Sequence, residues 1–217
     1  MGWVAGFAVI SGVGQAVGYL LYIRHMLRHE TRPNAASAFM FGYGTALLAV
    51  IEHDNGAGWP LLLLPVTCAL LGVVVAALCL RRGIAGRVDP LETMAFSVDL
   101  VLTAVYLGVW LIKDHGAISS RDGDSLALAF LIAVNATSAT SFAPLIRSTW
   151  QEPQRERPMP WLVWTGCYAL LAGITVADAG GRMSTLLIYP IFNVGLHFLI
   201  AIMALRPVPS HAATDAS

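Results

Sequence analysis

The chain has 217 residues, of which 57% are hydrophobic and only 12% are charged, and its basic and acidic residues balance at thirteen each. Soluble domains carry roughly 25% charged residues, so this composition excludes a water-soluble globular protein and indicates an integral membrane protein. The neutral net charge, with basic residues confined to loops, gives no sign of nucleic-acid binding.

Cysteine usage and ionisable residues give no sign of a metal centre or a catalytic centre. Cys68, Cys79 and Cys167 all lie within apolar segments and lack Cys-x-x-Cys spacing, so we interpret them as small residues of membrane helices. Residues 52–54 read Glu-His-Asp, and we expect them to form a solvated helix end rather than a metal or hydrolase cluster. No spacing singles out a nucleophile and a base. We therefore expect no metal, no cofactor and no enzymatic activity.

Seven apolar segments follow one another, and most have about the 20 residues that cross the hydrocarbon core of a bilayer. They comprise residues 3–23, 35–51, 59–80, 91–112, 126–146, 161–177 and 185–205. The first has no basic segment before it, so we expect an uncleaved span rather than a signal peptide. In that span Gly12, Gly14 and Gly18 miss the spacing of a nucleotide-binding loop and favour close helix packing.

Basic residues are distributed unevenly between the two sets of loops. One set holds ten arginines, and the other holds only Lys113, Arg121 and Arg182. Because loops rich in arginine and lysine stay in the cytoplasm, we expect the N-terminus outside and the C-terminus in the cytoplasm, in the plasma (cell inner) membrane. Residues 207–217 are small and polar, and we expect them to be disordered.

The sequence also contains signs of an internal duplication. When Pro65 is aligned with Pro190, at an offset of 125, residues 80–81 (Leu-Arg) fall on residues 205–206 (Leu-Arg). Residues 46–51 match residues 169–174 at an offset of 123. Such repeats decide the architecture of a chain. We predict an all-α membrane protein with a triple-helix bundle at 1–82, a linker helix with its flanks at 83–115 and a second triple-helix bundle at 126–206.

The segment 186–205 is unusual because it combines Pro190, Asn193 and Gly195 in its first half. A proline frees a backbone carbonyl within a helix, and a buried asparagine needs a hydrogen-bond partner. We therefore expect this helix to bend around a polar spot near the middle of the membrane.

The arrangement of three helices, one linker and three helices resembles the SWEET and PQ-loop superfamily of seven-helix transporters. Residues 142–147 (Phe-Ala-Pro-Leu-Ile-Arg), followed by a basic loop, are similar to the first helix of the family's triple-helix unit. Pro190, Asn193 and Gly195 are similar to the family's third helix, in which an asparagine faces the sugar. The resemblance implies two bundles related by an axis along the membrane normal, with a substrate site between them.

The expected site residues follow from this resemblance and from the duplication. Asn193 either binds the solute or ties two helices together, and Cys68 occupies the aligned position in the first repeat. Polar side chains of the fifth span, including Ser138, form a stripe along one side of the helix. Gln15 of the first span aligns with Ser138 in the duplication. Such a stripe either lines a water-filled path or bonds neighbouring helices. The candidate solute-binding residues are Asn193, Cys68, Tyr168, Tyr43, Ser138 and Gln15.

Prolines and ionisable residues within the spans suggest hinge and proton sites. Pro144, Pro190 and Pro65 are candidate hinges, although Pro144 could equally form a static kink. His197 lies one helical turn after Asn193 and either binds a proton or acts as a neutral hydrogen-bond donor. Asp99 either pairs with an arginine or serves as a proton site.

These observations leave three functional hypotheses. The first is a transporter that moves a small neutral solute, in the first instance a sugar, by alternating access between the two bundles. The second is proton-coupled transport of an amino acid or similar metabolite, and the third is a seven-helix receptor that binds its ligand without moving it. The expected partners are a small-molecule solute and the lipid bilayer. The oligomeric state, including a homo-oligomer, stays open.

Overall fold

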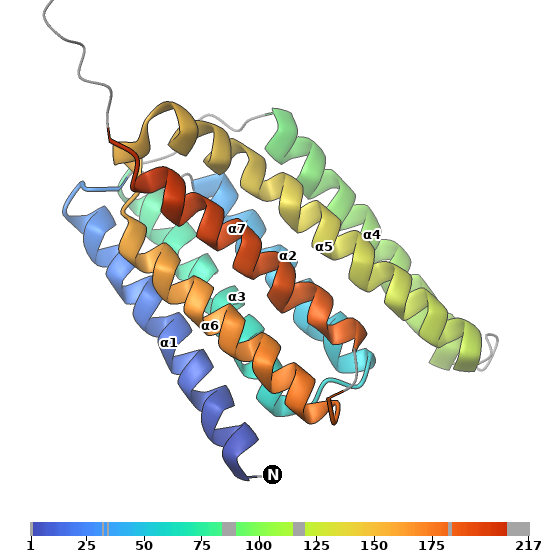
Figure 1. Ribbon diagram of the computed structural model, residues 1–217. Helices are drawn as coiled ribbons and strands as arrows, with labels where there is room; N and C mark the ends of the chain where they lie inside the picture. The colour runs from blue at the N-terminus through green and yellow to red at the C-terminus, as the bar shows by residue number, and fades with distance from the viewer. Residues whose placement is uncertain are drawn as a thin grey trace, which may run out of the picture.

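The structure, a computed structural model, describes residues 2–31, 33, 35–83, 90–114, 120–181 and 184–207. These residues form seven α-helices and two short 3-10 helices, and the described part of the chain contains no strand (Figure 1). The elements are α1 (Gly2–Leu27), α2 (Ala35–Asp54), α3 (Trp59–Arg81), α4 (Pro90–Asp114), α5 (Ser120–Gln151), η1 (Pro153–Arg155), α6 (Pro158–Asp178), η2 (Thr185–Leu187) and α7 (Ile188–Ala204).

Every apolar segment expected from the sequence is helical, and local signals explain where the helices begin and end. Prolines occupy the first turns of α3 and α6, where the missing N–H costs no intrahelical bond. After α6 the chain turns through Gly180 and Gly181, whose φ angles of 63° and 80° favour glycine. The polar tail expected to be disordered lies, from residue 208 onward, outside the described residues.

Six of the helices are long and apolar enough to cross a membrane, and α4 contains a shorter apolar segment, Phe96–Ile112. The outward-facing side chains of these helices include many large exposed hydrophobic residues, as expected where lipid replaces water. The chain is therefore a helical membrane protein.

Six helices form a closed ring. Around this ring the order is α1, α3, α2, α5, α7 and α6, and α6 returns to α1. Helix α4 lies outside the ring, packed along α5 and touching α2 (Figure 1).

The two ends of the bundle differ in charge. Helices α1, α3, α5 and α7 finish at one end, where α2, α4 and α6 begin (Figure 1). We call this the arginine end, and its described arginines are Arg24, Arg28, Arg81, Arg82, Arg147, Arg155, Arg157 and Arg206. The N-terminus of α1 lies at the opposite end.

Glycines allow three pairs of helices to approach closely. A side chain on Gly72 of α3 would meet the backbone of Gly42 of α2 at 3.0 Å, and one on Gly42 would meet backbone atoms of α3 at 3.1 Å. On α1, added side chains at Gly12, Gly14 and Gly18 would meet Leu63 of α3 and then Cys167 and Trp164 of α6. The expectation that the glycines of the first span serve helix packing is thus confirmed.

The start of α7 differs from the expected bent helix. Pro190 is the third residue of α7, directly after η2, and so lies in the first turn rather than near the middle of the helix. A proline in the first turn displaces no intrahelical hydrogen bond and needs no compensating bend. Pro190 therefore does not lie near the middle of its helix as expected, whereas Pro65 and Pro144 do lie inside α3 and α5.

The α2–α3 contact can be tested by filling the glycine crossing. We expect Gly42→Val to lower the melting temperature of the purified protein, because the added methyl groups collide with the backbone of α3. Overpacking of this kind costs about 1–3 kcal/mol. Gly108→Val on α4 is the matched control, since no atom lies within 4 Å of a side chain built there. Equal melting temperatures for the two variants would contradict the close crossing.

Candidate functional site

An inner cavity of about 80 Å³ lies within the ring, in the half nearer the arginine end. All six ring helices contribute to its wall, which consists mainly of aromatic side chains. The lining residues are Tyr19, Tyr22, Ser37, Ala38, Phe41, Gly72, Val75, Phe142, Leu145, Trp161, Trp164 and His197.

An outer cavity of about 160 Å³ adjoins the inner one and shares Tyr22, Ser37, Ala38 and Leu145 with it. Its remaining lining residues are Pro33, Pro144, Ser148 and Arg155, which belong to the arginine end. Sites for drug-sized ligands typically enclose roughly 300–1,000 Å³. We therefore expect a solute either to be small or to occupy both cavities together.

His197 supplies a polar group in the aromatic wall. Its ring Nδ1 lies 2.8 Å from the Asn193 carbonyl oxygen, and because a carbonyl can only accept, Nδ1 carries the proton. In the neutral ring, Nε2 is then an acceptor. The imidazole is packed among aromatic rings, with centroids 4.8 Å from Tyr168, 5.3 Å from Phe142 and 5.4 Å from Trp161.

Trp164 is held against α1 by a glycine and a hydrogen bond. Its indole Nε1 donates to the backbone oxygen of Gln15 at 3.2 Å. A side chain on Gly18 would come within 2.3 Å of the same nitrogen, so only glycine leaves room for the ring here. Tyr19 packs on Trp164 with a centroid separation of 4.9 Å. The position of this cavity wall therefore depends on the sequence of α1.

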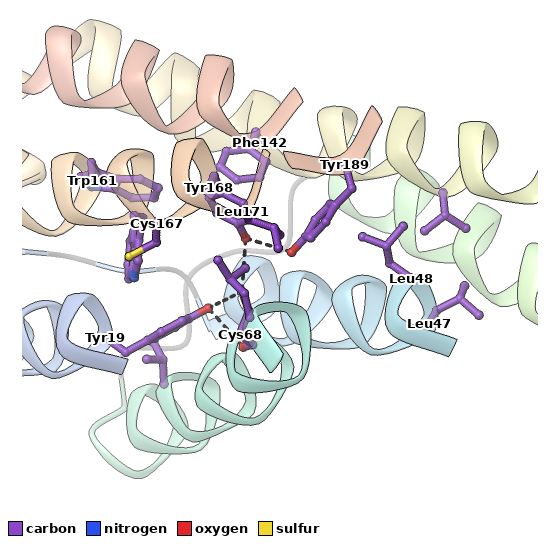
Figure 2. Close-up of a cluster of buried hydrophobic side chains, with 14 of the residues drawn as sticks. Tyr19, Leu47, Leu48, Cys68, Phe142, Trp161, Cys167, Tyr168, Leu171 and Tyr189 are labelled. Carbon is purple, nitrogen blue, oxygen red and sulfur yellow. Dashed lines mark hydrogen bonds between the residues drawn. The ribbon is translucent and has the colours of Figure 1, made fainter. Parts of the chain in front are cut away.

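Deeper in the bundle, polar groups from five helices meet in a hydroxyl cluster, which we define as Tyr19, Thr45, Cys68, Tyr168 and Tyr189 (Figure 2). The Cys68 sulfur lies 3.1 Å from the Tyr19 hydroxyl and 3.7 Å from the Tyr168 hydroxyl. The hydroxyls of Tyr168 and Tyr189 are 3.0 Å apart. All five side chains are buried, so the cluster forms a floor beneath the cavity.

Three of the six candidate solute-binding residues lie at or beside this floor. Cys68 and Tyr168 belong to the hydroxyl cluster, and Gln15 lies one helical turn before Tyr19. The Gln15 side chain is fully buried, and both of its amide atoms lack a hydrogen-bond partner among the described residues. Buried polar atoms are rarely left unpaired, so this amide is suited to bind a solute or a water molecule.

Asn193 lies close to the cavity wall but is absent from the cavity lining. Its side chain is 2% exposed, and its Nδ2 donates to the Tyr189 carbonyl at 3.0 Å, within α7. Its own carbonyl holds the His197 ring. In this structure Asn193 thus orients His197, while its predicted contact with a solute stays a prediction.

The other two candidates, Tyr43 and Ser138, lie away from the cavity lining, where α2 faces α4 and α5. The Tyr43 hydroxyl is 2.6 Å from the Thr103 hydroxyl of α4. A side chain on Gly44 would contact both Asp99 Oδ2 and Ser138 Oγ. Tyr43 thus joins α2 to α4, whereas the Ser138 hydroxyl donates to the Val134 carbonyl of its own helix at 2.8 Å.

Asp99 itself is 1% exposed, and its Oδ1 has no hydrogen-bond partner among the described residues. The expected pairing of Asp99 with an arginine is not found within the described part of the chain.

The cluster at residues 52–54 is only partly solvated. His53 and Asp54 are exposed, and Asp54 accepts a hydrogen bond from Tyr106 of α4. Glu52, however, is 3% exposed, so the expectation of a solvated helix end was wrong for this residue. Across the described ranges, no three His, Cys, Asp or Glu residues are close enough to hold a metal ion.

Sequence reasoning missed the aromatic wall and one buried carboxyl group. Trp161 and Trp164 of the wall precede the predicted Tyr168 at intervals of three and four residues, which places all three on one face of α6. That spacing could have revealed the wall. Glu156 is 3% exposed, although it lies in a link rich in charged residues that resembles a solvated loop. Burial raises the pKa of this carboxyl to about 7.

The packing of Trp164 on Gly18 leads to a direct test. We expect Gly18→Ala to displace the Trp164 ring, because a methyl group there overlaps the indole, and to shift intrinsic tryptophan emission while lowering the melting temperature. Gly6→Ala on the same helix is the control, since nothing lies within 4 Å of a side chain at Gly6. An emission spectrum unchanged by Gly18→Ala would show that Trp164 does not rest on α1.

Burial of Glu156 also predicts how stability varies with pH. A carboxyl whose pKa is raised on folding stabilises the protein below its ordinary pKa near 4.5, and this contribution is lost as pH rises through about 7. We therefore expect Glu156→Gln to match the wild-type protein at pH 4.5 and to exceed its stability at pH 8 by about 1–3 kcal/mol. Thermal unfolding in detergent at the two pH values measures this. If Glu156→Gln were less stable than the wild-type protein by the same amount at pH 4.5 and at pH 8, this prediction would be contradicted.

Comparison of the chain with protein-family models, with curated proteins and with solved structures finds no match. The interpretation of the site therefore depends on its own geometry. That geometry is an aromatic cavity reached from the arginine end, with an imidazole in its wall and hydroxyl groups at its floor.

Proposed function

We propose that this protein is a membrane transporter that moves a small neutral solute, with a sugar as the first candidate, by alternating access between two bundles. The observation that carries the proposal is the cavity enclosed by all six ring helices, accessible from one end and blocked at its floor. A site that is open to one side and closed to the other is what alternating access requires of an inward-open or outward-open state.

The order of helices around the ring supports a division into two equivalent units. Helix α3 lies between α1 and α2, and α7 lies between α5 and α6. Moving three places around the ring takes α1 to α5, α3 to α7 and α2 to α6. This order fits two triple-helix bundles in parallel orientation, with α4 as the linker, as in the SWEET and PQ-loop proteins that the sequence resembles.

The chemistry of the cavity suits a neutral solute with both apolar and hydrogen-bonding surfaces. Small-molecule sites combine largely aromatic walls with a few polar groups that fix orientation. Here Trp161 and Trp164 supply broad apolar faces, and His197 supplies the acceptor. Gln15 offers an unpaired amide beside the floor, where it could bind a solute that has passed the inner cavity.

Two prolines are placed where bending would change access to the cavity. Pro144 lies inside α5 and lines the outer cavity, and Pro65 lies inside α3 one turn before Cys68. Because a proline removes one intrahelical hydrogen bond, helices bend more readily at these positions. We propose that they act as hinges when the arginine end closes and the floor opens. In the proposed orientation the arginine end faces the cytoplasm.

A second candidate is proton-coupled transport of an amino acid or similar metabolite. It is favoured by the position of His197, an ionisable group that contacts the cavity directly. A histidine can bind or release a proton near neutral pH, which would link solute movement to a proton gradient.

Uptake into proteoliposomes distinguishes these functions. The panel consists of glucose, sucrose, several amino acids and a vitamin-sized solute, each tested with and without a pH gradient. We expect the sugar to equilibrate across the membrane without being accumulated by the gradient, whereas gradient-driven accumulation of a charged metabolite would favour the second candidate. If no solute moves while a panel member raises the melting temperature, the protein is a receptor and the transport proposal is wrong.

The solute that moves can then be used to test the cavity. We expect His197→Ala to reduce its uptake at least about fivefold, because the loss of a hydrogen bond to a buried group costs roughly 1–3 kcal/mol. His53→Ala is the matched control, because His53 is exposed at the opposite end of the bundle. Unchanged uptake by a properly inserted His197→Ala variant would exclude the inner cavity as the transport site.

A further inference from the structure

Glu156 connects two helices of the ring directly behind the cavity wall. It lies between η1 and α6, and its side chain is 3% exposed. One carboxylate oxygen accepts from the Tyr22 hydroxyl of α1 at 3.3 Å, and the other accepts from the Trp161 indole of α6 at 3.0 Å. Both of these rings line the inner cavity, and Trp161 also contacts His197. The carboxyl therefore fixes two of the cavity's aromatic rings.

The charged groups around Glu156 have their own partners or face outward. Within its own link, Arg155 pairs with Glu152 at 2.8 Å, and both side chains are largely exposed. On the side of α1, Glu30 lies 2.6 Å from His25 and 3.6 Å from Arg157. On the neighbouring helices, Arg147 belongs to α5 and Arg206 follows α7, where it stacks on Trp150 at 3.9 Å. Among the described residues, no cation pairs with Glu156.

A carboxylate held by two neutral donors and no cation is an unusual choice for a purely structural contact. Burying a charge without a cationic partner is costly, and the group lowers this cost by binding a proton. Burial accordingly raises the pKa of Glu156 to about 7, within the physiological range. An amide at this position could make similar hydrogen bonds without the penalty. Unlike an amide, the carboxyl can change its charge with pH, and packing alone does not require that property.

We propose that Glu156 is a proton-binding site that couples the position of Tyr22 and Trp161 in the cavity wall, and through them solute transport, to pH at the arginine end. The coupling to transport rests on the proposed function, whereas proton binding at Glu156 does not. His197 is not required for this role, since the proton is held outside the membrane-spanning helices.

The direction of the effect follows from linkage. The described conformation buries Glu156 and raises its pKa, so protonation stabilises this conformation relative to any in which the carboxyl reaches water. With pKa values of about 7 buried and 4.5 hydrated, the buried conformation is favoured about 25-fold more at pH 5.5 than at pH 8. At high pH the protein shifts toward conformations in which Tyr22 and Trp161 lose their common partner.

The first test follows proton binding without any solute. Intrinsic tryptophan emission of the full-length protein in lipid nanodiscs is titrated from pH 5 to 9 for the wild type, Glu156→Gln and Glu152→Gln. We expect a transition with a midpoint near 7 in the wild type and in Glu152→Gln, and no such transition in Glu156→Gln. Glu152 is the matched control because it lies in the same link but is exposed. A transition retained in Glu156→Gln, or absent from the wild type, would overturn the proposal.

The second test uses the solute identified by the uptake panel. We expect wild-type uptake to change by up to about 25-fold between pH 5.5 and 8, with Glu156→Gln changing less than about twofold. Identical pH profiles for the two proteins would overturn the coupling while leaving the transport function intact. Conversely, if the emission transition is found but no solute moves, the transport function fails and proton binding at Glu156 is still supported. Equal melting temperatures of the two proteins at pH 4.5 confirm that the variant is folded.

Discussion

Polar groups inside this bundle are shielded from water by lipid-facing helices, so they must find hydrogen-bond partners within the protein. The hydroxyl cluster meets that requirement by joining α1, α2, α3, α6 and α7 around the Cys68 sulfur. Because the three tyrosine hydroxyls bond groups from other helices, the cluster fixes the rotation and the height of α1, α3, α6 and α7 relative to one another. Tyr19 belongs both to this cluster and to the lining of the inner cavity, which lies on the side of the arginine end.

The cavity itself results from an alternation of small and large residues between neighbouring helices. Gly18 on α1 leaves room for the ring of Trp164 on α6. At the crossing of α2 and α3, Gly42 and Gly72 allow the two backbones to approach closely. Gly72 therefore contributes backbone rather than a side chain to the cavity wall. In the predicted duplication Gly72 aligns with His197, at the offset of 125. The two halves of the ring therefore face the cavity differently, one with an open backbone and the other with an imidazole.

Hydrophobicity and spacing predicted the membrane helices, because a segment without charges has few other stable conformations in lipid. They did not predict how each helix is rotated. Tyr43 and Ser138 are polar like Tyr168, yet Tyr43 bonds Thr103 of α4 and Ser138 bonds the backbone of its own helix, and neither lines the cavity, since rotation is decided by packing between helices. Pro190 was expected near the middle of the membrane, but it lies in the first turn of α7, directly after η2. Glu156 was overlooked because its burial depends on Tyr22, which is 134 residues away in the chain.

The hydrogen bond between His197 and the Asn193 carbonyl has a consequence for selectivity among functional groups. With Nδ1 committed as the donor, the neutral ring presents a lone pair, so it can receive a hydrogen bond but not give one. Alcohols and amines can satisfy that lone pair, whereas ketones, ethers and carboxylates have no hydrogen to offer. For such molecules the ring would first have to be protonated. In the proposed transporter, this backbone contact within α7 would thus favour solutes that donate hydrogen bonds.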